Sequence, residues 1–347
     1  MTTLSKPALP TPRATMRDVA ALAGVSVKTV SRVVNGEPGV SPAMTGKVRL
    51  AAEHLAFQLN LGARSLRRAD GRTATIGLIL EDVANPYASA LHRAVEDVAR
   101  ERGVVVLAGS LDEDPARERE LVTAFIARRV DGLIMMPTGP DHSYLVTERR
   151  AGTPLMFVDR TPGRLDADVV LTDNRKGAET GVAHLVAAGH RRIGFLGDRA
   201  GIATAQERHA GYVDALTAAG VPVSDQHVVH DATTVEIAQR AAEDMFTGAE
   251  PPTALFTAQN LVTIGALKAL RHLGLQHQVA LVGFDDFLLA DLLDPPVTVV
   301  AQDPHTIGRW AAEQLFRRSD GDSSAYRTQI VPSRLVARGS GEIPPRR

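Results

Sequence analysis

Residues 15–36 read TMRDVAALAGVSVKTVSRVVNG, and this stretch decides the fold of the N-terminal part of the chain. Thr15 and Asp18 have the spacing of a capping box, in which each residue satisfies a free amide at the start of a helix. Gly24 is placed to end that first helix, and Ser26 is placed to cap a second one. The stretch therefore predicts two short helices joined by a tight turn.

Apolar residues at helical spacing indicate how these helices pack. Val19 and Leu22 form the expected stripe of the first helix, and Val30 and Val33 form that of the second. Ser41 caps a third helix, whose expected stripe consists of Val48, Ala51, Ala52 and Leu55. We expect a compact all-α head of the helix-turn-helix type.

The charge of the chain is distributed unevenly along its 347 residues. Residues 1–72 contain 11 Lys and Arg against 4 Asp and Glu, whereas the remainder contains 28 against 36. A basic N-terminal segment on an acidic remainder is typical of a nucleic-acid-binding head joined to a body with another task. A merely solvated basic face is the alternative interpretation of this charge alone.

The residues from Asp18 to Pro42 resemble the DNA-binding head of the lactose/galactose repressor (LacI/GalR) family of transcriptional regulators, over some twenty-five positions. The resemblance implies that residues 27–34 form the recognition helix and that Val27, Lys28 and Arg32 face base edges in the major groove. It leaves the phosphate contacts to small polar residues, which fix the register on DNA. These are Ser26, Thr29, Ser31, Asn35 and Ser41.

The basic segment 60–72 is too short to form a stable isolated helix in water. By the same resemblance it is a hinge helix that folds in the DNA minor groove beside its twin from a second subunit. Its expected contact residues are Asn60, Ala63, Arg64 and Leu66, with Leu66 as the wedge that enters a base step. Residues 57–59 lack the proline that many relatives have there, which puts the entry to the hinge in doubt.

From residue 75 onward, short apolar runs alternate with amphipathic segments, which is typical of parallel sheets covered by helices on both faces. One ladder of strands is expected at 76–80, 104–107, 132–136 and 155–158. A second ladder is expected from 192 to 284. The late helix at 304–318 and the strand near Ile330 have no place in the second ladder, so we expect the chain to cross back.

The body over residues 73–340 resembles the periplasmic-binding-protein-like effector domain of the same family, in which a ligand lies between two doubly wound lobes. The expected organisation is a disordered leader (1–14), a head (15–59), a hinge (60–72), the body (73–340) and a tail (341–347). Within the body, lobe one is expected at about 73–171 plus 303–331, and lobe two at about 172–302 plus 332–340.

Polar residues at the carboxyl ends of the strands are the candidates for ligand binding, because ligands of open α/β sheets lie there. Asp159, Asp285 and Gln302 each follow an expected strand, and Thr204 and Arg208 match the family's pattern early in a helix. The candidate effector-binding set is Tyr87, Asp159, Thr204, Arg208, Gln259, Asp285 and Gln302. Carboxylates and a guanidinium suit adjacent hydroxyls, so the set points to a sugar or another polyol. For a lone Asp, a helix cap is the competing interpretation.

Several function classes lack their sequence signals. The chain has no cysteine, no run of 18 apolar residues and no apolar signal segment, so we expect a cytoplasmic protein without disulfides, thiolate chemistry or membrane spans. No phosphate-binding, dinucleotide-binding, nucleophile-elbow or zinc-protease motif occurs, and we expect no cofactor and no metal. The acidic run Asp112 to Asp114 is expected to be a solvated helix start.

The sequence thus predicts a regulator, most simply a repressor, that acts as a homodimer on a pseudo-palindromic operator and responds to a small-molecule effector. The alternative from another class is a soluble α/β metabolite-binding protein or enzyme with an incidental basic head.

Overall fold

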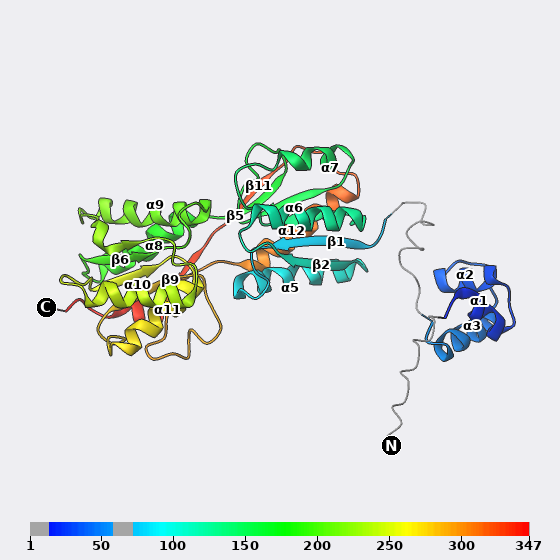
Figure 1. Ribbon diagram of the computed structural model, residues 1–347, viewed down its shortest axis with the longest axis horizontal. Coiled ribbons are helices and arrows are strands. Elements are labelled where there is room, and N and C mark those ends of the chain that lie inside the picture. Colours follow the sequence, from blue (N-terminus) through cyan, green and yellow to red (C-terminus); the bar gives the residue numbers. More distant parts are fainter. Residues whose placement is uncertain (1–13, 58–71, 347) are drawn as a thin grey trace, which may run out of the picture. The chain divides into compact units, whose positions relative to one another are not determined.

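The computed structural model describes residues 14–57 and 72–346, which belong to two compact units divided after Thr73 (Figure 1). The first unit is the head and the second is the body. The four residues predicted for the hinge, Asn60, Ala63, Arg64 and Leu66, lie outside the described residues, as does most of the predicted leader. No helix of the described residues is long and apolar enough to span a membrane.

The head consists of the helices α1 (Met16–Ala23), α2 (Val27–Asn35) and α3 (Pro42–His54). The predicted capping box at the start of α1 is present, and a left-handed glycine ends both α1 and α2, as their sequence indicated. The Ser26 and Ser41 side chains accept hydrogen bonds at the starts of α2 and α3. Local capping therefore sets the length of each helix.

The core of the head confirms the predicted stripe of α2 and corrects that of α1. Val30 and Val48 are fully buried, and Val33 packs against them. Leu22 is 52% exposed, and Ala20 is buried beside Val19 instead. The prediction for Leu22 was wrong because α1 contacts both neighbouring helices through its Val19 and Ala20 side, which turns Leu22 toward solvent.

The first sheet of the body has the strand order β11-β5-β4-β3-β1-β2, and all its pairings are parallel. Its strands are β1 (Thr75–Leu80), β2 (Val105–Ser110), β3 (Leu133–Met135), β4 (Leu155–Val158), β5 (Asp168–Thr172) and β11 (Thr328–Val331). Its helices are α5 (Pro86–Glu101), α6 (Pro115–Ala127), α7 (Val146–Arg150) and α12 (Pro304–Ser319), with a 3-10 turn at Ser143–Leu145. This sheet and its helices form lobe one.

The second sheet has the order β12-β10-β9-β8-β6-β7, and it is parallel except for β12, which runs antiparallel to β10. Its strands are β6 (Ile193–Leu196), β7 (Val228–Val229), β8 (Ala254–Thr257), β9 (Ala280–Phe284), β10 (Thr298–Ala301) and β12 (Arg334–Val336). Its helices are α8 (Asn174–Ala187), α9 (Ala203–Ala218), α10 (Val235–Thr247) and α11 (Asn260–His272). Short 3-10 turns occur at Asp225–His227 and Ser340–Glu342. Together these elements form lobe two.

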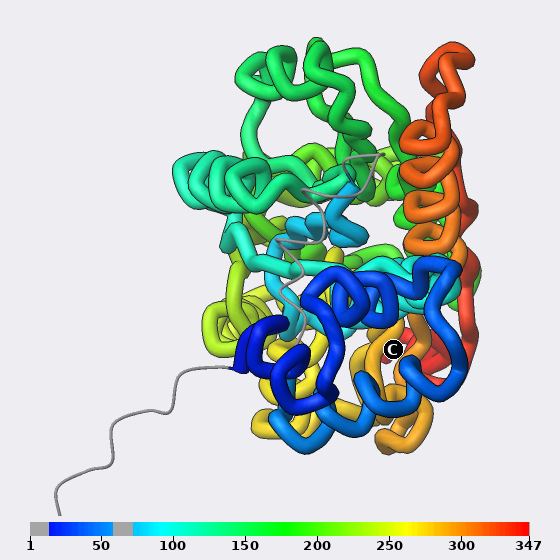
Figure 2. Tube along the Cα trace, turned by 90° about the vertical axis from the view of Figure 1, so that its right-hand side faces the viewer, coloured from blue at the N-terminus to red at the C-terminus, as the bar shows by residue number. Residues whose placement is uncertain are grey.

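The chain returns to lobe one after the second sheet, as the sequence order indicated. Helix α12 packs against α5, and β11 pairs with β5. The chain then crosses once more, and β12 pairs with β10 of lobe two. Figure 2 traces the orange α12 and the red segment after it along one side of the body. Three chain connections therefore join the two lobes.

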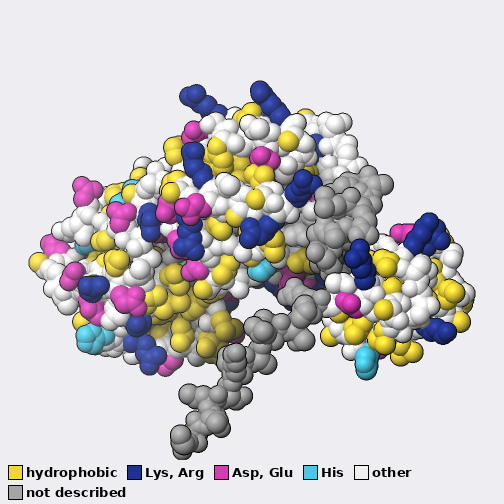
Figure 3. All heavy atoms as spheres, turned by 45° about the vertical axis from the view of Figure 1, so that its right-hand side comes forward, with side chains coloured by type: hydrophobic (Ala, Val, Ile, Leu, Met, Phe, Trp, Pro, Cys, Tyr) yellow, Lys and Arg dark blue, Asp and Glu magenta, His cyan; other side chains and the backbone are white. Residues whose placement is uncertain are grey.

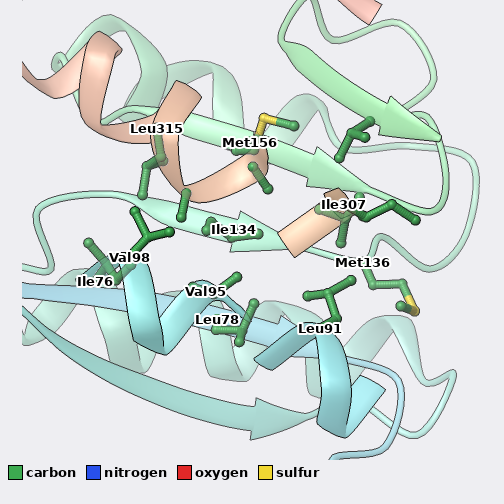
Figure 4. Close-up of a cluster of buried hydrophobic side chains, with 14 of the residues drawn as sticks. Ile76, Leu78, Leu91, Val95, Val98, Ile134, Met136, Met156, Ile307 and Leu315 are labelled. Atoms are coloured by element: carbon green, nitrogen blue, oxygen red, sulfur yellow. The ribbon is translucent and has the colours of Figure 1, made fainter. Parts of the chain in front are cut away.

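Each sheet is covered by a hydrophobic layer on both faces. In lobe one, Leu91 and Val95 of α5 and Ile307 and Leu315 of α12 pack onto one face of the sheet, where Ile134 lies between them (Figure 4). Such two-sided burial explains why the strands are continuous apolar runs rather than alternating ones.

Two elements at the junction of the lobes were not predicted. Strand β5 contains the charged Asp168, and α8 contains Gly177 and Gly181. An Asp in a strand and a Gly in a helix each weaken the local signal for regular structure. A Cβ at Gly181 would lie 2.8 Å from the Val300 side chain and 2.9 Å from that of Phe256. Helix α8 is stabilised by close packing against the second sheet. No pattern in the local sequence indicates this packing.

Candidate functional site

The first candidate site is the outer side of α2 in the head. Val27, at the start of the helix, is 43% exposed, whereas Val30 is fully buried. Lys28 is exposed, and Arg32 has a half-exposed side chain that lies 4.0 Å from Glu37. The helix thus buries one apolar side and presents a valine and two basic residues to solvent, which is the composition that a major groove accepts.

The small polar residues proposed for phosphate contacts lie at or near the ends of the head helices, except Ser31, which is in the middle of α2. Ser26 Oγ accepts from Thr29 N (3.1 Å) and lies 2.9 Å from Thr29 Oγ1. Asn35 Nδ2 donates to Ser31 Oγ (3.3 Å), and Ser41 Oγ accepts from the amide of Met44. These bonds orient the side chains and leave hydroxyl protons available for phosphate oxygens.

The second candidate site is a polar pocket in the body, with an empty volume of about 340 Å³, between the carboxyl ends of the two sheets. It is lined by residues of both lobes: Glu81, Asn85, Tyr87, Met136, Asp159, Arg160, Asp198, Thr204, Arg208, Gln259, Asp285 and Gln302. The structure therefore brings together all seven residues of the candidate effector-binding set.

Asp159 and Asp285 occupy equivalent places in the two lobes. Each directly follows a buried strand, has a positive φ (68° and 69°) and donates its amide to the neighbouring strand, to Val170 O and Val300 O respectively, at 2.9 Å. Asp tolerates this left-handed conformation better than most residues. Burial raises the pKa of Asp285, although Arg208 and Gln302 oppose the shift. Neither Asp is a helix cap, so the competing interpretation fails here.

Arg208 on α9 is held rigidly at the base of the pocket. Its Nε donates to Asn174 Oδ1 (2.8 Å), and its Nη1 donates to Ala258 O (2.7 Å). The guanidinium lies 3.6 Å from Asp285 and 4.0 Å from the centre of the Phe284 ring. The surrounding protein therefore fixes the position of the guanidinium before any ligand arrives.

Amide side chains connect the pocket across the lobes. Gln302 Nε2 donates to Asp285 Oδ1 (2.6 Å), and Gln302 Oε1 accepts from Thr172 Oγ1. Asn85 caps α5 and also exchanges hydrogen bonds with Asn260 of α11 at 3.0 and 3.4 Å. The pair Asn85 and Asn260 is thus a direct polar bridge between lobe one and lobe two.

Among the buried polar atoms of the pocket lining that have no hydrogen-bond partner are the Oε1 of Gln259 and the hydroxyl of Tyr87. Burial is also the main cause that raises the pKa of the Tyr87 hydroxyl well above its ordinary value. A buried polar atom without a partner loses free energy of about 1–3 kcal/mol. Both atoms are therefore positioned to bond to a polar ligand.

The candidate set omitted five lining residues: Glu81, Asn85, Met136, Arg160 and Asp198. Glu81 directly follows β1, and Asp198 follows β6 after one glycine, so the strand-end rule that selected Asp159 would have found both. Arg160 is also two residues beyond a strand end, directly after Asp159, but its conformation depends on an acidic partner from another loop.

That acidic partner is Glu113, and it corrects the interpretation of the acidic run. Asp114 caps α6, as predicted. Glu113, expected to be solvated, has a side chain that is only 6% exposed, and its carboxylate lies 2.7 Å from Arg160 Nη1. The run of charges suggested a solvated segment. Glu113 is buried instead, because it forms an ion pair with Arg160, which is distant in the sequence. No group of metal-ligating side chains occurs among the described residues.

Known proteins resemble this chain over both units. Residues 15–60 match the model described as bacterial regulatory proteins, lacI family, and residues 182–341 match the periplasmic binding protein-like domain. The Escherichia coli K12 regulator GalR is 31% identical over 333 residues, which are 95% of this chain and 96% of GalR.

Solved structures agree with this. A putative ribose operon repressor from Burkholderia thailandensis is 37% identical with a TM-score of 0.69, and the match covers 76% of this chain and 99% of that one. The lac repressor dimer bound to operator and the anti-inducer ONPF is 27% identical with a TM-score of 0.81, and the match covers 94% and 99%. Both units therefore have the architecture of transcriptional regulators.

Proposed function

This chain belongs to the LacI family of bacterial regulatory proteins, and on that premise we propose that it is a transcriptional repressor whose affinity for operator DNA is set by a polyhydroxylated metabolite bound between its lobes. The observation that carries the effector part of the proposal is the polar pocket that both lobes line. Within it, the Gln259 amide oxygen and the Tyr87 hydroxyl lack partners and are buried.

DNA recognition is assigned to α2. Val27, Lys28 and Arg32 contact base edges in the major groove, because they form the exposed side of a helix whose other side is buried. A guanidinium forms two hydrogen bonds to guanine, and a valine methyl contacts the methyl group of thymine. Phosphates are contacted by Ser26, Thr29, Ser31, Asn35 and Ser41.

The hinge is assigned to the minor groove on the sequence alone. Asn60, Ala63 and Arg64 bind there as a short helix beside the same helix of a second subunit, and Leu66 enters a base step. Two copies are needed because a single head makes too few contacts for a useful specificity ratio.

A second copy of the chain is expected to bind the body through an apolar surface on lobe two. Leu288, Leu289 and Leu292 are 83%, 53% and 75% exposed beside an apolar pocket lined by Leu267 and Phe287. Figure 3 shows a patch of hydrophobic side chains low on one face of the body. An apolar patch of this kind is typical of a protein interface. The protein is thus a homodimer, as the lac repressor relative is by its description.

The effector is a sugar or a related polyol. Asp159, Asp285 and the fixed guanidinium of Arg208 offer paired acceptors and donors to adjacent hydroxyls. Similar structures are described with bound cellobiose and bound ribose. Binding alters the angle between the lobes, and this change reaches the hinges of the dimer and alters operator affinity.

Regulation rather than turnover is the proposed task of the pocket, and the protein acts in the cytoplasm, where bacterial operators are. The pocket residues are mainly carboxylates, guanidiniums and amides, several of them held by hydrogen bonds to neighbouring groups, in a chain that belongs to a family of regulators.

Operator binding with and without sugars tests the proposal. The operator is first selected from genomic fragments, and its affinity is measured by fluorescence anisotropy with ribose, galactose, cellobiose and nucleosides. We expect one class to change the affinity by roughly 5–150-fold, and Arg208→Ala to abolish the change while leaving affinity without sugar intact. If the response survives Arg208→Ala, Arg208 is not part of the effector site. If the protein binds no genomic fragment in preference to the others, the proposed function is contradicted.

A further inference from the structure

Acidic groups outnumber basic groups in the polar pocket. The carboxylates that line it are Glu81, Asp159, Asp198 and Asp285, and the guanidiniums are Arg160 and Arg208. A fifth carboxylate, that of Glu113, contacts Arg160 from behind the lining. An anionic ligand would therefore bind only if at least one guanidinium were free to receive it.

Arg160 is not free. Its Nη1 contacts Glu113 at 2.7 Å and 2.9 Å and donates weakly to Pro137 O at 3.4 Å, and its Nε lies 3.3 Å from Asp159. Thr138 Oγ1 donates to Glu113 Oε2 (3.1 Å) and fixes that carboxylate in turn. The side chains of Arg160 and its two acidic partners are at most 8% exposed, so water screens these ion pairs little.

The guanidinium of Arg208 is likewise occupied by neighbouring protein groups. Its Nε and Nη1 bond to Asn174 and Ala258, Asp285 lies 3.6 Å away, and the Phe284 ring covers one face of the guanidinium. Binding of a phosphate group prefers a fork of two donors that point at it together. Arg208 therefore has little capacity left for a phosphate, whereas a single hydroxyl oxygen can still approach it.

Glu81 is buried in the pocket close to other acidic groups. Burial is the largest of the causes that raise its pKa to about 8; Glu113 and Asp198 act in the same direction, and Arg160 opposes them. The carboxyl group thus stays protonated near neutral pH even though a guanidinium is close. Asp159 adds to the same shift. A site that disfavours one more negative charge on its own side chain also disfavours a negative charge on a ligand.

We propose that Glu113, which holds Arg160, together with the lining carboxylates of Asp159 and Asp198, excludes anionic effectors from this pocket, so that its occupant is an uncharged or amine-bearing polyol and not a phosphorylated or carboxylated metabolite. This inference rests on the function proposed above and adds a specificity rule to it.

Inorganic phosphate is the first probe, because it needs no knowledge of the effector. The thermal unfolding midpoint of the full chain is measured in potassium phosphate and in potassium chloride of equal ionic strength. The wild type should show no saturable stabilisation by phosphate. Glu113→Gln should acquire one, because it leaves Arg160 with a single acidic partner. Glu120→Gln, an exposed carboxylate on α6 of the same lobe, is the matched control and should behave as the wild type.

Saturable stabilisation of the wild type by phosphate, removed by Arg160→Ala, would overturn the proposal. Ribose with ribose 5-phosphate, and galactose with galactose 1-phosphate, form the second probe, in case Glu113→Gln does not fold. Each parent sugar that binds should do so at least about tenfold more tightly than its phosphate ester, and Asp198→Asn, which removes a lining carboxylate, should reduce that ratio. Tighter binding of the ester refutes the rule.

The two proposals fail in different ways. If a phosphate ester changes operator affinity, the regulator remains and the charge rule is wrong. If uncharged sugars bind without any effect on operator affinity, the charge rule stands and the regulatory function is wrong.

Discussion

Arginine side chains have different environments in the head and in the body. In the head, Arg32 has a half-exposed guanidinium whose nearest acidic group, Glu37, is 4.0 Å away, so little energy is needed to release it. In the body, Arg160 and Arg208 are buried among fixed partners. Exposed cations suit DNA, which supplies its own negative charge, whereas buried and paired ones suit an uncharged ligand.

Arg32→Ala should relax specificity at one base pair in each half-site, because it removes a bidentate contact worth about 1–3 kcal/mol of discrimination. Binding titrations on the selected operator and its single-base variants measure this. Arg49→Ala, which removes an exposed charge on α3, should weaken all sequences alike or not at all. Unchanged discrimination in Arg32→Ala would remove Arg32 from the base contacts.

Glu81 should make the body less stable as the pH rises from about 4.5, its ordinary pKa, to about 8, its raised pKa. Over this range the folded protein binds a proton that the unfolded chain does not, so the free energy of unfolding falls with pH. Glu81→Gln should flatten that part of the profile. Urea unfolding followed by Trp310, which packs against the lobe-one core, measures it. Equal slopes for Glu81→Gln and the wild type would contradict the assignment, and Glu120→Gln should keep the wild-type slope.

At the scale of elements, the helices of the body pack in pairs through glycine. A Cβ on Gly211 would lie 2.1 Å from Arg175 O between α8 and α9, and one on Gly265 would lie 2.5 Å from Val235 O between α10 and α11. A Cβ on Gly308 would similarly lie 2.6 Å from Leu91 O between α5 and α12. Each pair is thus set at a distance that only glycine permits.

Gly211→Ala should destabilise the body by about 1–3 kcal/mol, because α8 and α9 must move apart to admit the methyl group. Gly46→Ala is the matched contrast. Gly46 lies in the exposed part of α3 with no atom within 4 Å of its Cβ position, so the alanine should stabilise the head by about 0.5–1 kcal/mol. Urea unfolding of the full chain resolves both changes. A body that tolerates Gly211→Ala without loss would show that the helix pair is looser than its geometry indicates.

The same elements show what the sequence could and could not reveal. Caps such as Thr15 and Ser26 are local, so the boundaries of the head helices could be read from the sequence. Helix α8 could not, because packing of its glycines against another sheet, and not its own propensity, stabilises it. In the pocket, strand ends identified Asp159 and Asp285, whereas Arg160 and Glu113 depend on an ion pair that spans 47 residues.

At the scale of the whole molecule, the pocket lies where the two lobes can respond to it. Lobe one contributes Asp159 and Glu81, and lobe two contributes Arg208 and Asp285, while the pair Asn85 and Asn260 bridges them directly. A ligand that contacts both sets changes the relative free energies of the lobe arrangements by its differential affinity for them. In the proposed dimer, both proposed hinge segments receive the same change, so one ligand class can control DNA binding by both heads.

Leu292→Glu should convert the protein into a monomer, because it puts a charge into an apolar surface that a second copy is proposed to cover. Operator affinity should then fall by about 100-fold or more, since the second head no longer binds as part of the same molecule. Analytical ultracentrifugation and fluorescence anisotropy measure the two effects on one preparation. Val223→Glu, at a partly exposed valine beyond α9, is the control and should stay dimeric. A dimeric Leu292→Glu would place the interface elsewhere, whereas a monomer with unchanged operator affinity would break the proposed link between dimerisation and DNA recognition.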